Sequence, residues 1–467
     1  MKTIHYPRKG LRLEDAVTQE TFDRYFTMLE NWRQGPGVFG SLNIHACWGT
    51  VDSLDKRYQG ETVSHQFYLF RLYKMLYDRF REPRFRTTVD AMVAHLLYLQ
   101  DASGGFIHST SEFEPTFNTA CCPIHAFHPT MELCEYYRWE YANETLKAQI
   151  PDAVRRHWEW AQPALWQIGN GGHRPLDFPG WCGVTNQDLT VVAALAQIGK
   201  TFGDWSLYET YGKPAVAHYF SPAYYYKEIG LFERGDGNNF PERTPYYGVI
   251  LNRLKDLYEL TGEERYREVS ENVIRNLFEV TYIAEDGLRH MSRGVKTDPA
   301  DKTKRCGFDR SSINFQSYGV LIPFMEEYLR EHPDEEKAQI LEELKSTAAA
   351  YLFFDAGFPK AFNPGNPIFT VVSTPDSEGL LQLMLHVLGD RLEKPVLRET
   401  PVLHRQYKNF LYKTNGRLWL VEKDGERTYG GYTRYNAGIT IGADEKPVLG
   451  DYSDLDQCDI LEIVTFN

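Results

Sequence analysis

Hydrophobic residues along the chain follow helical spacings of two kinds. In the segment 83–100 the apolar residues fall on one face of a helix, and they do so again in 335–354. A helix of this kind buries one stripe and exposes the rest. The segment 185–202 is instead apolar almost all round, which predicts a helix buried on every side.

Helices of the two kinds alternate with a regular period. The buried kind begins near residues 61, 130, 185, 244, 312 and 375, roughly sixty residues apart. A sustained period marks a repeat architecture. With a first outer helix in 18–34, the pattern predicts a mainly α fold, an (α/α)6 toroid of six outer–inner helix pairs. An open solenoid of helix pairs is the alternative, but it would expose one side of helices that offer little polar surface.

Glycine follows the outer helices, and a large apolar residue usually comes after it. The stretch YLQDASGGFIHS, Tyr98 to Ser109, is one example, and EIGLFERG and AEDGLRHMS are others. Glycine adopts the left-handed conformation that ends a helix. We therefore expect each glycine to close its outer helix and the apolar residue to fold back on the last turn.

The connections between helices also differ in kind. Short polar links such as TGEERYRE follow the inner helices, whereas long loops rich in aromatic, His, Asp and Arg residues lead into them. Long irregular loops usually carry function. The pattern therefore predicts a functional rim where the inner helices begin and a structural rim where they end. A non-enzymatic scaffold, the remaining alternative, would normally have short regular loops.

After about residue 395 the pattern changes to alternating apolar and polar positions. Asn415-Gly416 and Asp424-Gly425 stand where hairpin turns belong. We therefore divide the chain into a toroid catalytic domain, 1–394, and a small antiparallel β-rich appendage, 395–467, packed on the toroid.

Composition and charge narrow the classes of partner. The 467 residues are 42% hydrophobic and carry a net charge of −13, without the basic footprint of a nucleic-acid binder. The chain has no apolar run long enough for a membrane span, no hydrophobic segment typical of a signal peptide, and seven irregularly placed cysteines. These features favour a cytoplasmic protein with no membrane partner, although a chain whose leader had been removed would look the same. The oligomeric state stays open.

One segment suggests specific chemistry. ERGDGNNFPERTPYYGVIL places Asp236, Glu242, Arg243, Tyr246 and Tyr247 around the start of an inner helix. It resembles the DG…E…YY segment of the heparinase- and alginate-lyase-type toroid polysaccharide lyases. The resemblance implies that one of the two tyrosines serves as base and acid in β-elimination of a uronate glycan.

The preceding inner helix carries a second part of the resemblance. In GWCGVTNQDLTVVAALA, Asn186 matches an asparagine with which these lyases help to neutralise the substrate carboxylate, but Gln187 stands where they have histidine. His173, in the loop just before, is a candidate for the missing donor. Asn186 could instead cap its helix, with Thr185 as competitor.

Elimination beside a uronate has requirements that can be stated without the family. A base must remove the weakly acidic C5 proton, and hydrogen-bond donors must hold the carboxylate as negative charge develops. Asn186, His173 and Arg243 are suitable donors, and a tyrosine near an arginine can act as the base. With 30 tyrosines in the chain, packing is the alternative role for Tyr246 and Tyr247.

Two other reactions remain open on the same fold. The helix DLTVVAALAQIGKTFGDWSLYE resembles one in unsaturated-glucuronyl hydrolases, which implies an acid at Asp188; a glycosidase could pair it with Asp236 or Glu242. Asp188 could instead only stabilise the helix dipole. A sugar epimerase would use histidines, here His65, His173 and His386.

Further residues are predicted to line the same rim as substrate contacts. They are His65, Trp181, Asp236, His125, His128, Arg310 and Trp48. The segment TACCPIHAFHPT lacks the spacing of zinc ligands, and its two prolines predict an extended loop. We therefore expect no bound metal and no cofactor. The predicted function is an enzyme, a lyase acting on an acidic oligosaccharide or polysaccharide, with exo action on short glycans.

Overall fold

The computed structural model describes most of the helices and the cores of the strands. The described residues are 2–31, 33–39, 42–44, 66–106, 108–110, 113–116, 123–167, 183–234, 241–310, 313–351, 358–362, 369–373, 378–398, 403–407, 410–414, 418–423, 426–432, 440–441, 447–448 and 462–466. Within these ranges, no helix combines the length and the hydropathy needed to cross a membrane.

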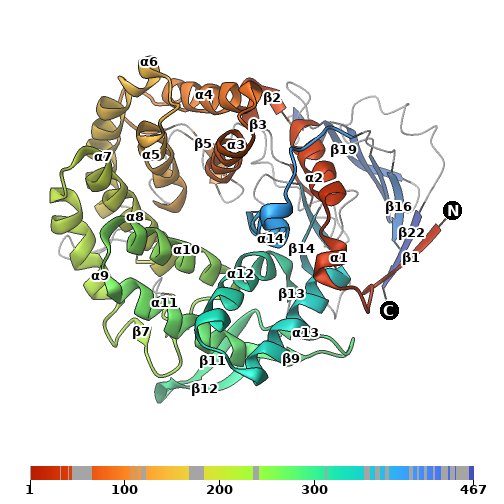
Figure 1. Ribbon diagram of the computed structural model, residues 1–467. Coiled ribbons are helices and arrows are strands. Elements are labelled where there is room, and N and C mark those ends of the chain that lie inside the picture. Colours follow the sequence, from red (N-terminus) through yellow and green to blue (C-terminus); the bar gives the residue numbers. More distant parts are fainter. Residues whose placement is uncertain are drawn as a thin grey trace.

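Two concentric sets of helices form a ring (Figure 1). The inner helices are α3 (Gln66–Phe80), α5 (Pro123–Arg138), α8 (Thr185–Phe202), α10 (Thr244–Thr261), α12 (Phe315–Glu331) and α14 (Glu378–Leu388). The outer helices are α2 (Gln19–Asn31), α4 (Pro83–Tyr98), α7 (Ile150–Gln167), α9 (Lys213–Tyr219), α11 (Glu264–Leu277) and α13 (Glu335–Tyr351). Short helices α1 (Leu13–Ala16) and α6 (Glu144–Lys147), a π-helix, Tyr208–Gly212, and two 3-10 helices, Phe278–Val280 and Gly389–Arg391, complete the described helical part. The prediction of an α/α toroid is confirmed.

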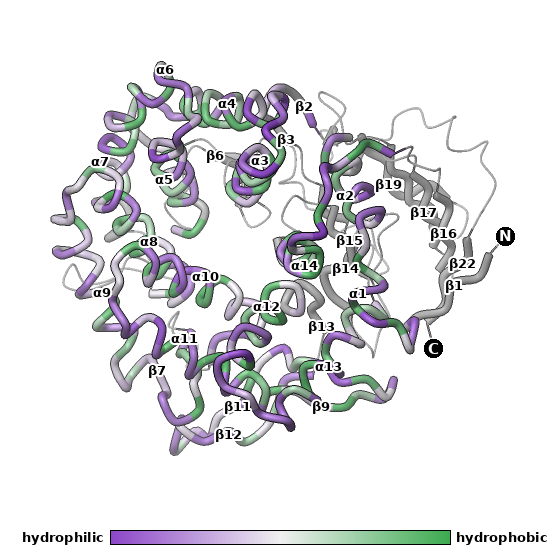
Figure 2. Tube along the Cα trace, viewed as in Figure 1, coloured by the Kyte–Doolittle hydropathy of each residue, from purple (hydrophilic) through white to green (hydrophobic). Residues whose placement is uncertain are grey.

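Burial follows the two hydrophobic patterns. Nearly every residue of α8 between 185 and 199 is buried, as expected of an inner helix. In α4 the buried residues form one stripe that includes Phe85, Val89 and Leu96. Figure 2 shows hydrophilic and hydrophobic residues alternating along outer helices such as α4 and α7.

The ring is closed at the junction between its last and first pairs. After α14, the segment 389–398 runs across α2 and α3. Arg79, in the last turn of α3, donates hydrogen bonds to the carbonyl oxygens of Gly389 (2.9 Å) and Asp390 (2.6 Å). Arg398 pairs with the buried carboxylate of Asp23 on α2 at 2.7 Å. These contacts distinguish the closed toroid from an open solenoid.

Strands also cross this junction, on the side where the inner helices begin. A four-stranded sheet has the order β13 (Ile313–Asn314), β14 (Phe358–Phe362), β15 (Phe369–Ser373) and β4 (Leu42–Ile44). Since β4 precedes the first inner helix and β15 precedes the last, the β15–β4 pairing joins the two ends of the ring.

Two glycines allow inner helices to approach closely. A Cβ atom at Gly248 of α10 would lie 2.8 Å from the Val320 side chain on α12. A Cβ atom at Gly319 of α12 would lie only 2.0 Å from the backbone oxygen of Gly379 on α14. Both glycines follow a tyrosine, in YGVI and YGVL, so they occupy equivalent positions in the repeat.

The expectation that glycine closes the outer helices is wrong for α9 and α11. These helices end at Tyr219 and Leu277, about ten residues before Gly230 and Gly287. The two glycines have φ of +61° and +74° and lie in the turns of small hairpins. The hairpins are β7 (Tyr225–Tyr226) with β8 (Leu231–Phe232), and β9 (Thr281–Ile283) with β10 (Arg289–Met291). Left-handed glycines instead end the inner helices α8 and α10, at Gly203 and Gly262.

The remaining strands form one larger sheet and several small hairpins. The six-stranded sheet has the order β1 (Lys2–Tyr6), β22 (Glu462–Phe466), β16 (Leu403–Tyr407), β17 (Phe410–Thr414), β18 (Leu418–Lys423) and β19 (Glu426–Tyr432). Pairs β1–β22 and β16–β22 are parallel and the others antiparallel. The hairpins are β2 (Arg33–Gly35) with β3 (Val38–Phe39), β5 (His108–Thr110) with β6 (Phe113–Thr116), β11 (Gly294–Asp298) with β12 (Asp301–Asp309), and β20 (Thr440–Ile441) with β21 (Pro447–Val448).

The larger sheet draws on both ends of the chain. Its first strand comes from residues 2–6, whereas its other strands all follow residue 402. Figure 1 shows this sheet and both termini on the side of the ring that holds α1 and α2. The predicted hairpins are present as the antiparallel pairs β17–β18 and β18–β19, although their turn residues lie outside the described residues. The division at residue 395 stays a prediction.

Candidate active site

We call the two edges of the ring the N-terminal rim, where the inner helices begin, and the C-terminal rim, where they end. Long loops lead to the N-terminal rim, and several predicted site residues lie in parts of these loops outside the described residues. They are Trp48, His65, His173, Trp181 and Asp236. The backbone of His125 is described but its side chain is not.

The starts of α8 and α10 are joined by the short segment that follows β8. The backbone N–H of Thr185, the first residue of α8, donates to the carbonyl oxygen of Arg234 at 3.2 Å. The Thr185 hydroxyl donates to the carbonyl oxygen of Glu233 at 2.7 Å. On the other side, the N–H of Glu242, just before α10, donates to the carbonyl oxygen of Phe232 at 2.7 Å. The two helix starts therefore share one backbone frame.

Arg234 connects the other side chains of this frame. Its guanidinium lies 3.0 Å from the Glu242 carboxylate and 5.2 Å from the centre of the Tyr246 ring. Its side chain is 18% exposed, and that of Glu242 is fully buried. An arginine held in this way keeps a fixed orientation at the rim. Arg234 stands in the same sequence segment as the tyrosines, but no sequence pattern marked it as a site residue.

Two predicted residues, Glu242 and Arg243, lie directly before α10. A Glu242 carboxylate oxygen also accepts a hydrogen bond from the backbone N–H of Arg243 at 3.0 Å. Arg243 is the N-cap residue of α10 and is half-buried. Glu242 thus fixes both the helix start and Arg234, an arrangement that leaves it poorly placed to exchange a proton with a sugar.

The two neighbouring tyrosines have different surroundings. Tyr247 is buried, and its hydroxyl accepts a hydrogen bond from the Phe232 N–H at 2.9 Å. Burial raises the pKa of Tyr247 well above its usual value. Tyr318, at the equivalent position of α12, accepts from the Met291 N–H at 3.0 Å in the same way. The hydrogen bond of Tyr247 is therefore a structural contact that occurs at equivalent positions of two repeats.

Tyr246 lies on the face of α10 that is turned to the ring axis. It precedes Arg253 by seven residues, which is two helical turns, so both share one face. The Arg253 guanidinium reaches Met131 of α5, 3.0 Å from its sulfur, and the Tyr68 hydroxyl of α3 at 3.4 Å. Because α3 stands opposite α10 in the ring, this face points inward (Figure 1). Tyr246 is half-buried.

Asn186 is buried at the start of α8, with 4% of its surface exposed. The N-cap of α8 is Val184, so neither Asn186 nor Thr185 caps the helix, and that alternative is wrong. Among the described residues, none donates a hydrogen bond to the Asn186 side-chain oxygen. Buried amide oxygens in proteins nearly always accept a hydrogen bond.

Asp188 is turned toward the outer layer of helices. It is completely buried, and its carboxylate accepts hydrogen bonds from the Tyr219 hydroxyl of α9 at 2.5 Å and from the Gly183 N–H at 3.0 Å. These bonds tie the start of α8 to its outer partner. This position is unlike that of an acid that must reach a substrate on the ring axis.

The segment TACCPIHAFHPT is helical where it is described, so the prediction of an extended loop is wrong. α5 begins at Pro123 and continues through Pro129. His128 is buried, with its ring stacked on Phe67 of α3 at a centroid distance of 5.1 Å. It therefore packs inside the ring, close below the N-terminal rim.

The two remaining candidates lie apart from this frame. Arg310 is exposed, and its guanidinium lies 4.6 Å from the centre of the Tyr282 ring on β9. His386, which an epimerase would need, is in the last turn of α14 and pairs there with Glu326. This places His386 toward the C-terminal rim.

The ring axis is filled by ionic contacts below Tyr246. Arg71 of α3 pairs with Glu135 of α5 and, at 3.2 Å, with Asp256 of α10, which in turn lies 3.3 Å from Arg253. On the C-terminal rim, a hollow of about 920 Å³ opens below these residues and is lined by the ends of α3, α5, α8 and α10. Arg71, Glu135 and Asp256 therefore form part of the wall of this hollow.

Comparison with solved structures identifies the fold. A sugar epimerase from a ruminal bacterium superposes with a TM-score of 0.53 over 80% of this chain and 99% of its own, at 11% identity. The cellobiose 2-epimerase of Bacillus thermoamylovorans B4167 gives 0.54 over 79% and 98%, at 10% identity. The fold is that of the α/α-toroid carbohydrate-active enzymes. A D-mannose isomerase gives 0.51 over 80% and 98%, also at 10% identity.

Sequence comparison gives a different result. No protein-family model and no curated protein matches the chain. The likeness therefore concerns the toroid fold, and the predicted resemblance to toroid carbohydrate-active enzymes is confirmed at that level.

Proposed function

We propose that this protein is a lyase that cleaves a uronate-containing oligosaccharide or polysaccharide by β-elimination. The observation that carries the proposal is the Arg234–Tyr246 pair at the start of α10, with the guanidinium 5.2 Å from the ring centre. A tyrosine that faces the ring axis beside a fixed cation has the two properties that proton removal next to a carboxyl group requires.

The reaction assigns one role to each residue of the frame. Tyr246, as phenolate, takes the C5 proton, and the C4–O bond breaks as the C4–C5 double bond forms. The departing oxygen then takes the proton back from Tyr246. Arg234 stabilises the phenolate form of Tyr246 before proton transfer and the negative charge that then builds up on the uronate. The Asn186 amide, buried in the neighbouring helix start, is assigned to the substrate carboxylate, with Arg243 and His173 as further donors.

The surroundings of Asp188 and Glu242, the two described carboxylates among the predicted candidates, favour elimination over ordinary glycoside hydrolysis. Hydrolysis needs two carboxyl groups that reach the bond from opposite sides. Asp188 is bonded to Tyr219 and Gly183, and Glu242 is paired with Arg234. Both are committed to structural partners.

Sugar epimerisation is the second candidate. The solved structures with the same fold include a sugar epimerase, a cellobiose 2-epimerase and a mannose isomerase. Epimerisation also begins with removal of a proton from the carbon beside a carbonyl group, a step for which the sequence offers the histidines His65, His173 and His386. The reactions differ in whether a bond to oxygen then breaks.

One set of incubations distinguishes the candidates. The protein is mixed with uronate-containing oligosaccharides and, separately, with neutral gluco- and manno-oligosaccharides, and the products are followed by ultraviolet absorbance and mass. We expect a new ultraviolet-absorbing product from the uronates, with product masses that sum to the substrate mass. A gain of one water per cleavage would reject elimination in favour of hydrolysis. An isomer of unchanged mass from a neutral sugar would establish epimerisation instead.

A further inference from the structure

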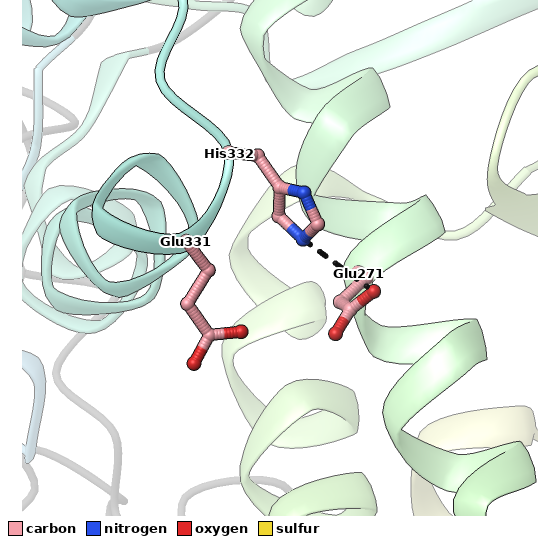
Figure 3. A group of neighbouring side chains, drawn as sticks. All are labelled: Glu271, Glu331 and His332. Carbon is pink, nitrogen blue, oxygen red and sulfur yellow. Dashed lines mark ion pairs between the residues drawn. The ribbon is translucent and has the colours of Figure 1, made fainter.

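Three metal-ligating side chains meet at the C-terminal rim, remote in sequence from the candidate active site. Glu271 comes from α11, Glu331 is the last residue of α12, and His332 follows it. Figure 3 shows the His332 ring facing the Glu271 carboxylate across a narrow gap, with Glu331 reaching down from the neighbouring helix. Within the described residues, this is the one group of three such side chains whose ligand atoms converge.

The distances suit a single small ion. The ligand atoms of the three residues lie within 4.8 Å of one another, and the His332 ring nitrogen is 3.6 Å from a Glu271 oxygen. Bonds from zinc to nitrogen or oxygen are about 2.0–2.2 Å long, so two ligands of one ion are at most about 4.4 Å apart. Rotamer adjustments of less than about 1 Å would therefore close the site. The His332 ring is already oriented by contact with the Tyr328 ring, at a centroid distance of 4.6 Å and an interplanar angle of 34°.

The local charge also favours a cation. A hollow of about 230 Å³ between α10, α11 and α12 adjoins the group, and four carboxylates but only two cations line it: Glu259, Glu271, Glu327, Glu331, Lys255 and Arg267. The C-terminus of α12 adds the partial negative charge of its unpaired carbonyl groups. One histidine with two carboxylates is a ligand set that suits zinc and similar divalent transition metals better than magnesium or calcium.

We infer that Glu271, Glu331 and His332 bind a divalent transition-metal ion of the zinc type. The ion would link the outer helix α11 to the inner helix α12 at the C-terminal rim, whereas the chain connects them at the other rim through residues 278–314. Arg267 opposes binding, because it pairs with the other Glu271 oxygen at 3.2 Å. The site is independent of the proposed reaction at the N-terminal rim.

The test is titration of the full chain with zinc chloride alone, by calorimetry, with Co²⁺ absorption as a second readout. We expect one ion per chain at this site and a higher melting temperature with zinc. Glu271→Gln and His332→Ala should each weaken zinc binding by more than about tenfold. Loss of a residue that only hydrogen-bonds to a metal ligand already weakens binding by about tenfold or more, and loss of a ligand itself should cost at least as much. Arg267→Gln should tighten it by about tenfold, because a positive charge near the ion is removed.

Glu264→Gln is the matched control. Glu264 lies on the same helix and pairs with the same Arg267, at 3.5 Å, but does not belong to the group. Its loss should leave zinc affinity within about twofold of that of the parent, because Glu264 does not bind the ion. Absence of binding in the parent would overturn the inference. So would zinc binding that persists unchanged in both Glu271→Gln and His332→Ala, since the ion would then be bound elsewhere.

Discussion

Tyr246 and Tyr247 are adjacent in sequence, yet one faces the ring axis and the other is buried against a hairpin. The hydroxyl of Tyr247 is committed to the Phe232 N–H, and Tyr318 repeats that bond with Met291. The sequence alone does not show which of two adjacent tyrosines faces the ring axis, because this depends on how the helix is rotated about its own axis. The structure shows the rotation of α10: Arg253, two turns after Tyr246 on the same face, reaches Tyr68 across the ring.

Substitution of Tyr246 tests the proposed base directly. Tyr246→Phe should lower kcat by about 10²–10⁴-fold, because the proton acceptor is lost while the ring remains. Tyr318→Phe is the control: it removes a buried hydroxyl at the position equivalent to Tyr247, away from the proposed base, and should lower the melting temperature with near-parental kcat. Equal loss of kcat in the two variants would mean that Tyr246 acts only through stability.

Arg234 and Glu242 should act as one unit. Arg234→Gln should reduce kcat by about 10²–10³-fold, the usual cost of losing one donor that stabilises developing charge. Glu242→Gln should cost about tenfold in the parent, because it only orients Arg234, and almost nothing in the Arg234→Gln background. Additive effects in this double-mutant cycle, measured as log kcat, would contradict a positioning role for Glu242.

His157 introduces a sensitivity to mild acid. It is buried among aromatic rings in α7, where burial lowers its pKa from 6.5 to about 3. The folded protein therefore keeps His157 neutral while the unfolded chain takes up a proton below pH 6.5. The stability contributed by this difference is complete above pH 6.5 and is lost as pH falls toward 3, at about 1.4 kcal/mol per pH unit.

The measurement is the free energy of unfolding in urea at pH 7 and pH 5. The parent should lose about 2 kcal/mol through His157 alone, and His157→Phe should lack that part of the decrease. An identical pH dependence in parent and variant would show that the imidazole is already protonated in the folded protein.

At the scale of elements, the distance between neighbouring inner helices depends on the glycine at which one helix contacts the next. Gly319 meets backbone, whereas Gly248 meets only the Val320 side chain. Alanine at either position raises helix propensity by about 1 kcal/mol. The change in the free energy of unfolding should therefore differ between the two substitutions, because a side chain can move away from the new methyl group more easily than a helix backbone can.

We expect Gly319→Ala to destabilise by about 2–3 kcal/mol, because α12 and α14 would have to separate. Gly248→Ala should be nearly neutral alone, and the addition of Val320→Ala should relieve its remaining crowding. Chemical denaturation of the three variants decides this. Similar losses for Gly319→Ala and Gly248→Ala would contradict the role of the backbone contact.

The elements that the sequence predicted well are those whose burial follows one period. The stripe of α4 and the all-round burial of α8 could be predicted because hydrophobic spacing depends only on the helix itself. The hairpin turns at Gly230 and Gly287 could not, since a helix cap and a hairpin turn both favour left-handed glycine. Pro129 was similarly misleading, because packing of α5 inside the ring overrides its local preference.

At the scale of the molecule, closure of the ring depends on contacts between residues far apart in sequence. Asp23 receives hydrogen bonds from Arg398, Gln19 and the Val396 N–H, so the end of the toroid is held by its first outer helix. Periodicity predicted six pairs but contains no information on which side chains fasten the last pair to the first. The same holds for Arg234, whose partners come from the fold and from no local pattern.

Arg398→Ala should destabilise the protein by about 1–2 kcal/mol, because the buried Asp23 loses a charged partner while keeping two other donors. Arg24→Ala is the control: it removes an exposed pair with Glu20 and should cost less than about 0.5 kcal/mol. Hydrogen exchange should accelerate in α2 and in 389–398 of Arg398→Ala. Protection that is unchanged there would mean that the ring is fastened by other contacts.

Strand β1 precedes the toroid in sequence and its neighbour β22 follows it. During synthesis, β1 must wait with an open edge until β22 has left the ribosome. The helical ring can assemble pair by pair as it emerges, but the sheet cannot. The sheet is therefore completed only after every helix of the ring has been made.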